Sequence, residues 1–87
     1  MKAERTSVDA LLKTARGQID GLLKMVAEDQ YCIDICNQIL ATQSVLRRAN
    51  KEILRAHMDC CVKEAFEAGN SEQKFEEILS LLDKLGK

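Results

Sequence analysis

Apolar residues recur every three or four positions along most of the chain, which is the spacing of one face of an α-helix. Ser7 is suited to cap the first such segment, and the polar sequence Glu28-Asp29-Gln30 ends it. The second segment contains no helix breaker, and Gly69 with Ser71 forms a stop and a new cap before the third. The pattern predicts one all-α domain over residues 1–87, with helices over about 7–27, 31–68 and 71–85.

The predicted second helix needs a partner helix. Every seventh residue along it is apolar or a cysteine: Cys32, Ile39, Leu46, Ile53 and Cys60. A stripe with this period is typical of helices that pack along their length against another helix. Gly17 and Gly21 each cost the first helix about 1 kcal/mol relative to alanine, so we predict that they permit the close approach of another backbone.

Composition favours a helical subunit that associates with further copies. Proline is absent and aromatic residues make up 3% of the chain, which argues against a β-rich fold. A chain of 87 residues also buries a smaller fraction of its surface than a larger domain. No apolar run approaches the roughly 20 residues that cross a bilayer, and the first residues lack the apolar core of a signal peptide. We therefore expect no membrane association, a cytoplasmic location and reduced thiols.

The charges are segregated along the chain, although the formal net charge is only −1. Residues 1–24 sum to +2 and residues 43–55 to +3, whereas residues 25–42 and 59–87 each sum to −3. If the two basic segments meet on one face of an oligomer, a protein of low net charge can still attract nucleic acid.

The strongest chemical signal comes from the cysteines and the single histidine. His57 and Cys61 are four residues apart, so they project from one face of the second helix and can hold one ion together. Cys32 is the third candidate ligand, but an unbroken helix holds it about 37 Å from His57. One subunit cannot bring these three side chains together.

An antiparallel copy of the same helix removes this difficulty. A two-fold axis near Leu46 places Cys32 opposite Cys61 and Cys36 opposite His57. Each dimer then has two equivalent sites, made by Cys32 of one subunit and His57 with Cys61 of the other, as expected of an isologous interface.

Two thiolates and one imidazole suit a soft ion of low coordination number, which favours copper(I) over nickel or cobalt. Zinc remains an alternative if Cys36 acts as a fourth ligand, because zinc prefers a closed tetrahedral set. Cys36 is otherwise balanced between packing and the role of an accessory thiol, and Cys60 is expected in the core because it lies on the seven-residue stripe.

Several ordered motifs cover the chain from about Leu12 to Leu82. They are Arg16-Gly17-Gln18-Ile19-Asp20-Gly21, Asp29-Gln30-Tyr31-Cys32-Ile33-Asp34-Ile35, Gln38-Ile39, Leu46-Arg47-Arg48-Ala49-Asn50 and His57 with Cys61. Together they closely resemble the copper-sensitive operon repressor family, CsoR. The resemblance implies a three-helix subunit that forms an antiparallel helical-bundle dimer and then a dimer-of-dimers tetramer. It also implies binding to operator DNA without a helix-turn-helix, and release of that DNA when an inducer binds.

The resemblance assigns roles to individual residues. Cys32, His57 and Cys61 match the copper(I) ligands of the family. Tyr31 and Glu77 match residues that hydrogen-bond to the ligand histidine and link metal binding to DNA release. The surface that meets operator DNA, where phosphate charges must be neutralised, matches Lys13, Arg16, Gln18 and Arg48.

Departures from the family pattern leave two alternatives open. A persulfide-responsive repressor would use Cys32 and Cys61, although the retained His57 favours copper. A copper-buffering protein without DNA binding is suggested by Leu11, where many members of the family carry arginine, and by the acidic pI near 5.8. An enzyme is not expected, because the sequence has no paired-carboxylate site, no glycine-rich phosphate loop and no second histidine.

Overall fold

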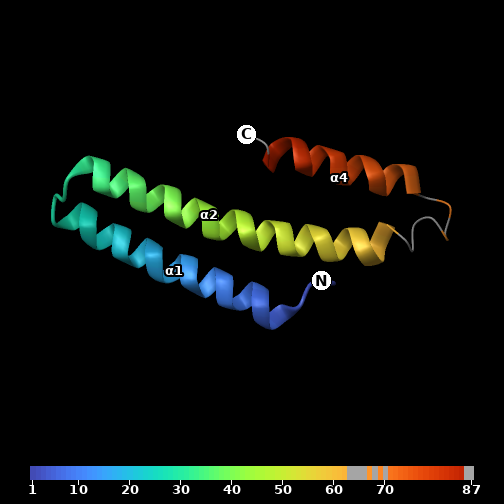
Figure 1. Ribbon diagram of the computed structural model, residues 1–87, viewed down its shortest axis with the longest axis horizontal. Coiled ribbons are helices and arrows are strands. Elements are labelled where there is room, and N and C mark those ends of the chain that lie inside the picture. Colours follow the sequence, from blue (N-terminus) through green and yellow to red (C-terminus); the bar gives the residue numbers. More distant parts are fainter. Residues whose placement is uncertain (63–66, 68, 70, 86–87) are drawn as a thin grey trace.

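The computed structural model describes residues 1–62, 67, 69 and 71–85, apart from the side chains at positions 61, 62, 71 and 74. All regular secondary structure in these residues is helical. The long α-helices of this described part are α1 (Arg5–Ala27), α2 (Cys32–His57) and α4 (Ser71–Leu85) (Figure 1). A π-helical turn, η1 (Met58–Val62), directly follows α2. The all-α fold predicted from the sequence is confirmed. None of the described helices is apolar over enough residues to cross a membrane.

The N-terminus of α1 differs from the prediction, because Ser7 is not its cap. The helix begins at Arg5, and Glu4 occupies the N-cap position without a side-chain capping hydrogen bond. The Ser7 hydroxyl donates instead to the Glu52 carboxylate of α2, at 2.7 Å. This serine therefore ties the start of α1 to α2 and sets the register between the two helices.

The turn between α1 and α2 closes with a Schellman motif. The Gln30 N–H donates to the Met25 carbonyl at 3.0 Å, and the Asp29 N–H donates to the Val26 carbonyl at 3.1 Å. Asp29 has a φ of 51°, the left-handed conformation that this motif requires. Aspartate tolerates this conformation better than most residues because its short polar side chain can hydrogen-bond locally. The tight turn sends α2 back antiparallel to α1 (Figure 1).

Small side chains form the buried contact between α1 and α2. Val8 and Ala15 are buried on α1, and Thr42 and Ala49 are buried on α2. The Thr42 hydroxyl donates to the Gln38 carbonyl one turn earlier, at 3.1 Å, so its burial leaves no unpaired hydroxyl. Gly17 and Gly21 lie outside this contact, since a Cβ added at either would meet nothing within 4 Å. The close approach predicted from these glycines is not made within the subunit.

The second helix changes its hydrogen-bonding pattern after His57. The sequence predicted one helix from Tyr31 to Ala68, but the α-helix ends at His57 and five residues of π-helix follow. The predicted end at Ala68 lies outside the described residues. A π-turn pairs each N–H with a carbonyl five residues earlier, and such turns occur frequently at functional sites. This one contains Cys61.

The subunit is a single layer of helices, in which α1 and α4 flank α2 (Figure 1). The principal-axis extents are 56 × 27 × 13 Å, so the subunit is elongated and flat. The radius of gyration is 17.1 Å, compared with about 12 Å for a compact domain of this length. Domains normally bury their apolar faces between at least two layers. This subunit therefore lacks the second layer that a partner would provide.

Candidate metal site and basic surface

The two halves of the predicted metal site lie at opposite ends of α2. Tyr31 is the N-cap residue and Cys32 is the first residue of the helix, whereas His57 is the last. Cys61 lies in η1, although its side chain is outside the described part of the structure. A helix of 26 residues separates Cys32 from His57 by about 37 Å. The ligands of one subunit therefore cannot close around one ion.

One subunit has no complete metal site among the side chains that the structure describes. No three of its described histidine, cysteine, aspartate or glutamate side chains are close enough to hold an ion. Cys32, Cys36 and Cys60 are exposed thiols. Cys60 is thus not buried within the subunit, contrary to the expectation that it packs in the core. Cys32 and His57 lie at opposite ends of α2, so a copper(I) site that uses both donors would need two chains.

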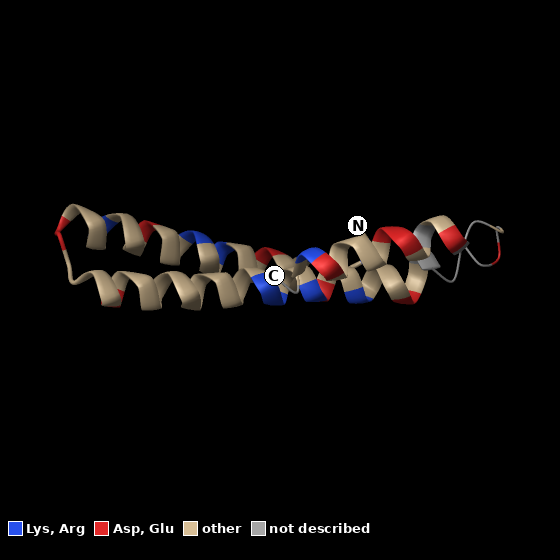
Figure 2. Cartoon of the chain, turned by 90° about the horizontal axis from the view of Figure 1, so that it is seen from above, with Lys and Arg blue, Asp and Glu red and all other residues tan. Residues whose placement is uncertain are grey.

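A long segment of α2 between its two ends is uncharged. Residues 35–46 carry no charge, and Figure 2 shows this part of α2 in tan before the basic segments begin. Ile39 and Leu46, which belong to the seven-residue stripe, are 42% and 41% exposed. The adjacent helix adds exposed apolar side chains at Leu12, Ile19, Leu23 and Val26. So many exposed apolar side chains on two neighbouring helices indicate an association site.

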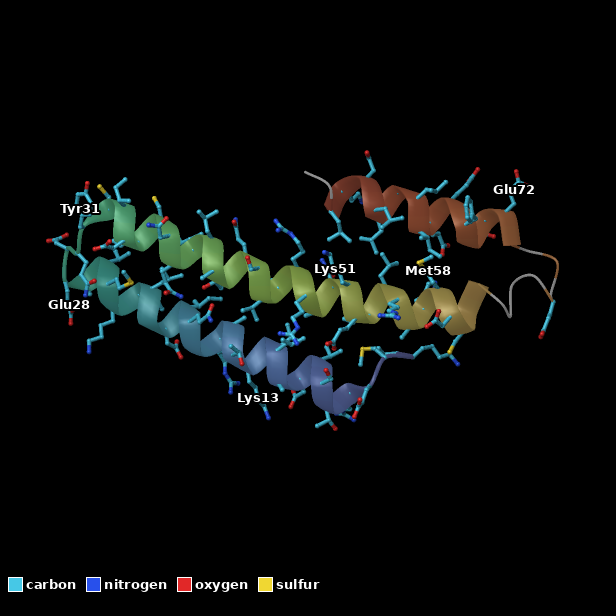
Figure 3. All side chains as sticks on the ribbon, viewed as in Figure 1. Lys13, Glu28, Tyr31, Lys51, Met58 and Glu72 are labelled. Carbon is cyan, nitrogen blue, oxygen red and sulfur yellow. The ribbon has the colours of Figure 1, made fainter. Side chains whose placement is uncertain are left out.

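Helix α4 brings Glu77 to the side of His57. Both residues line a cavity of about 270 Å³ between α2 and α4, and the other lining residues are the apolar Ile53, Leu54, Ile78 and Leu81. This arrangement places a carboxylate and an imidazole beside one cavity with apolar walls. Tyr31 lies at the far end of α2 and is 66% exposed (Figure 3), so it can reach a histidine only in another subunit.

Lys13, Arg16 and Arg48 are exposed and lie at similar levels of the antiparallel pair α1 and α2. The Ser7–Glu52 hydrogen bond sets the register. Arg48, one turn before Glu52, is level with the residue one turn after Ser7, and Lys13 lies about 3 Å further along the axis. Basic segments occur near the middle of both helices (Figure 2), and Lys13 points away from α2 (Figure 3).

Lys13 forms an ion pair on the surface of α1. Its Nζ lies 2.9 Å from Oδ2 of Asp9, one turn earlier, and both side chains are more than half exposed. The hydrogen bond from Lys13 and its positive charge lower the pKa of Asp9. The carboxylate therefore stays ionised at neutral pH and competes with any other anion for Lys13.

Gln18 is separated from these cations. Its Oε1 atom is buried and accepts no hydrogen bond within the described structure. Residues two apart project from nearly opposite sides of a helix, so Gln18 and the exposed Arg16 cannot share a face. The structure does not bring Gln18 together with the basic residues. Leu11 is half-buried and lies one turn from the buried Ala15, which accounts for an apolar residue at that position.

Sequence reasoning missed two features of this region. The π-turn after His57 contains neither glycine nor proline, so no breaker marked it. The second feature is a cavity of about 580 Å³ with a basic edge, lined by Arg47, Lys51, Leu54, Arg55, Met58, Leu82 and Leu85. Three basic residues at four-residue intervals were the signal that could have located it.

Comparison with known sequences identifies relatives that are transcriptional regulators. The profile of a family described as metal-sensitive transcriptional repressors matches residues 4–84. The copper-sensing transcriptional repressor CsoR of Mycobacterium tuberculosis is 41% identical over 68 residues, which are 78% of this chain. The present chain spans only 57% of the length of that relative.

Two solved structures share the fold. One is the copper-sensing repressor CsoR with Cu(I) from Geobacillus thermodenitrificans NG80-2, with a TM-score of 0.85 and 35% sequence identity over 94% of this chain and 85% of that chain. The other is the nickel-responsive transcriptional regulator InrS, with a TM-score of 0.78 and 29% identity over 98% of this chain and 96% of that chain. Because these two relatives respond to different metals, the fold alone does not select the ion, and the ligand set must.

Proposed function

Because the chain belongs to the metal-sensitive transcriptional repressor family, we propose that it is a copper(I)-responsive, DNA-binding transcriptional repressor. Cys32 of one subunit, with His57 and Cys61 of the partner subunit, binds the ion, and binding releases operator DNA. The observation that carries the proposal is the position of Cys32 at the start of the continuous α2, with His57 at its end and Cys61 in the following η1. An antiparallel second copy brings the two ends together twice in each dimer.

The choice of copper(I) follows from the donor atoms. Bound copper(I) would supply a soft centre that is satisfied by two thiolates and one imidazole. The chain has one histidine, which leaves few nitrogen donors for nickel or cobalt. Glu77 lines the same cavity as His57 and can accept a hydrogen bond from the ring nitrogen that does not bind metal. Such a bond fixes the orientation of the ring.

Coupling to DNA would pass through α4. His57 and Glu77 share their cavity with Ile78, which is buried, and with Leu81 on α4. A shift of the imidazole toward an ion would therefore change the packing of α4 against α2. A ligand alters DNA affinity only if it binds the two arrangements of α4 against α2 with different affinities. The cavity that His57 shares with α4 would let the bound ion favour one of these arrangements.

DNA binding would need several subunits, because one chain carries a formal net charge of −1. Lys13, Arg16 and Arg48 give each subunit a small exposed basic area. A tetramer repeats this area four times, and phosphate neutralisation increases with the number of contacts made together. The uncovered faces of the single-layer subunit supply the surface for this assembly.

The proposal is tested by titrating reduced protein with copper(I) under anaerobic conditions, using a DNA duplex selected by the protein from a random pool. We expect one copper(I) per subunit and a loss of DNA affinity of about 10-fold or more, within the usual range of allosteric coupling. His57→Ala should respond poorly while it still binds the DNA.

Two outcomes of this titration would replace the proposal. If an organic persulfide releases the DNA by linking Cys32 to Cys61 and copper(I) does not, the protein is a persulfide-responsive repressor. If the wild type binds copper(I) but selects no DNA, it is a copper-buffering protein.

The shared site has its own test. Mixing a Cys32→Ala chain with a His57→Ala/Cys61→Ala chain should restore about one intact site per heterodimer, because the two defects lie in different halves of each site. Neither variant alone should show the copper affinity of the wild type. Full copper affinity in a verified monomer would contradict the shared site.

A further inference from the structure

Cys36 has no role in the proposed copper site. We propose that it gives each intersubunit site a fourth ligand, so that the dimer also binds a tetrahedral divalent ion, Zn²⁺ or its softer analogue Cd²⁺. Cys32 and Cys36 of one subunit and His57 and Cys61 of the partner subunit would hold this ion. The inference rests on the antiparallel dimer of the proposed function, but not on DNA binding or on copper as inducer.

Cys32 and Cys36 lie on one face of α2. Cys32 and Cys36 are four residues apart within α2, and both thiols are exposed. Side chains at this spacing lie one above the other, with Cβ atoms about 5–6 Å apart. Two cysteines in this arrangement can turn their sulfur atoms toward one ion that approaches the exposed face. The pair is thus a two-thiolate half-site on one chain.

In the proposed dimer, an antiparallel copy of α2 lies opposite this face. Helix α2 is continuous from Cys32 to His57, so a two-fold axis between Leu46 and Arg47 sets every pairing along it. The same axis that places Cys32 opposite Cys61 also places Cys36 opposite His57. These two pairs are about 6 Å apart along the helix axis, one turn of helix. An ion between the two pairs therefore has four soft or borderline donors around it.

The π-turn also favours a compact site. Because η1 begins directly after His57, the backbone from His57 to Cys61 follows π rather than α hydrogen bonding. The wider π-turn advances less along the axis per residue. Along the helix axis, the backbone of Cys61 is therefore closer to His57 than an α-helix would place it. This shortens the distance between the Cys32–Cys61 pair and the Cys36–His57 pair.

Coordination number should separate the two kinds of ion. Copper(I) is satisfied by Cys32, His57 and Cys61, whereas zinc prefers four protein ligands in a closed site. Cys36 should therefore contribute much to zinc affinity and little to copper affinity. A cysteine that only packs in the dimer interface would affect both ions equally. This difference is the signature that the experiment looks for.

The experiment compares reduced full-length wild type with Cys36→Ser and Cys60→Ser. Cys60, which lies in η1, is a matched control because it is another exposed thiol and belongs to neither proposed ligand set. Zinc affinity is measured by competition with a chromogenic chelator, copper(I) affinity by anaerobic competition, and oligomeric state by size-exclusion chromatography. We expect Cys36→Ser to lower zinc affinity by about 10-fold or more, at least the effect of removing a single group that supports a ligand. Copper(I) affinity should change by less than about threefold, and Cys60→Ser should change neither.

X-ray absorption of the zinc-loaded wild type needs no variant and should count three sulfur atoms, at about 2.3 Å, and one nitrogen. Two sulfur atoms, unchanged zinc affinity in Cys36→Ser, or an equal loss of both metals would overturn the inference. These results leave the copper titration of DNA binding untouched. Conversely, zinc bound through Cys36 in a protein that ignores copper(I) would support this inference and contradict the proposed function.

Discussion

Lys13 is held by Asp9 in the free subunit, so in the proposed DNA complex a phosphate would compete with a carboxylate for it. The pair is exposed, and exposed ion pairs contribute little to stability, so a phosphate can displace the carboxylate easily. The pKa of Asp9 is lowered by Lys13, and such an interaction is fully present above the ordinary aspartate pKa. It is lost only as the pH falls through the lowered value. The carboxylate thus restrains Lys13 throughout the neutral range.

Asp9→Asn should raise the affinity for any DNA duplex by about two- to fivefold, because it frees Lys13 and removes a charge that repels phosphate. Fluorescence anisotropy at fixed ionic strength measures this change. Glu72→Gln is the control, since it makes the same change in net charge on α4. Equal effects of the two substitutions would mean that Lys13 does not contact DNA.

The sequence predicts the donor atoms of the proposed site, because the residue type fixes them, and this prediction remains untested. The environment of a polar side chain could not be predicted from the sequence. Ser7 and Gln18 are polar residue types that usually lie at the surface, yet Ser7 hydrogen-bonds to Glu52 and the side-chain oxygen of Gln18 is buried. Their roles depend on which edge of the apolar face of α1 packs against α2, and the spacing of the apolar residues does not specify that edge. The prediction that Gln18 belongs to the surface that meets operator DNA remains untested.

At the scale of the elements, α1 has one packed side and one open side. Gly17 and Gly21 lie where the subunit has no neighbour within 4 Å of an added Cβ. Glycine within a helix lowers stability relative to alanine, because its backbone loses more conformational freedom on folding. In the free subunit these glycines therefore lower the stability of α1, and no close packing within the subunit requires them.

Gly21→Ala should increase the free energy of unfolding by about 0.5–1 kcal/mol, seen as a higher melting temperature at the same protein concentration. Gly69→Ala should do the opposite, because Gly69 has a φ of 80°, which a residue with a side chain adopts only with strain. If Gly21→Ala instead weakens the assembly, a second subunit approaches α1 at this point, as the sequence pattern first suggested.

The ends of the elements were predictable only where a local motif forms them. The Asp29 turn has a polar sequence that ends a helix, and the structure completes it with two backbone hydrogen bonds. The change to a π-helix after His57 has no comparable signal, since the sequence there continues a helical pattern. This difference matters for the site, because Cys61 lies beyond the change.

At the scale of the whole molecule, a single layer of helices with the proposed ligands at both ends of α2 favours association with a second copy. The sequence could predict this tendency from the seven-residue stripe and from the distance between Cys32 and His57. It could not show that the subunit is only 13 Å thick, because that depends on α4 lying beside α2 rather than across it. In the proposed assembly, the metal site and the DNA surface would both depend on contacts between copies of this flat subunit.

DNA binding should accordingly depend on a few cations repeated by symmetry. Lys13, Arg16 and Arg48 lie at similar levels of the α1 and α2 pair, while Arg47, Lys51 and Arg55 line the cavity beside α4. Arg48→Ala should weaken binding to selected and random duplexes alike, because a phosphate contact carries no sequence information. The slope of log affinity against log salt should become shallower by about one unit for each phosphate that the variant no longer neutralises. Arg55→Ala is the matched control, since it removes the same charge from the cavity side of α2 and should leave the slope nearly unchanged, with copper(I) binding intact in both variants. A salt titration in which Arg48→Ala and Arg55→Ala behave alike would place the DNA surface elsewhere on the assembly.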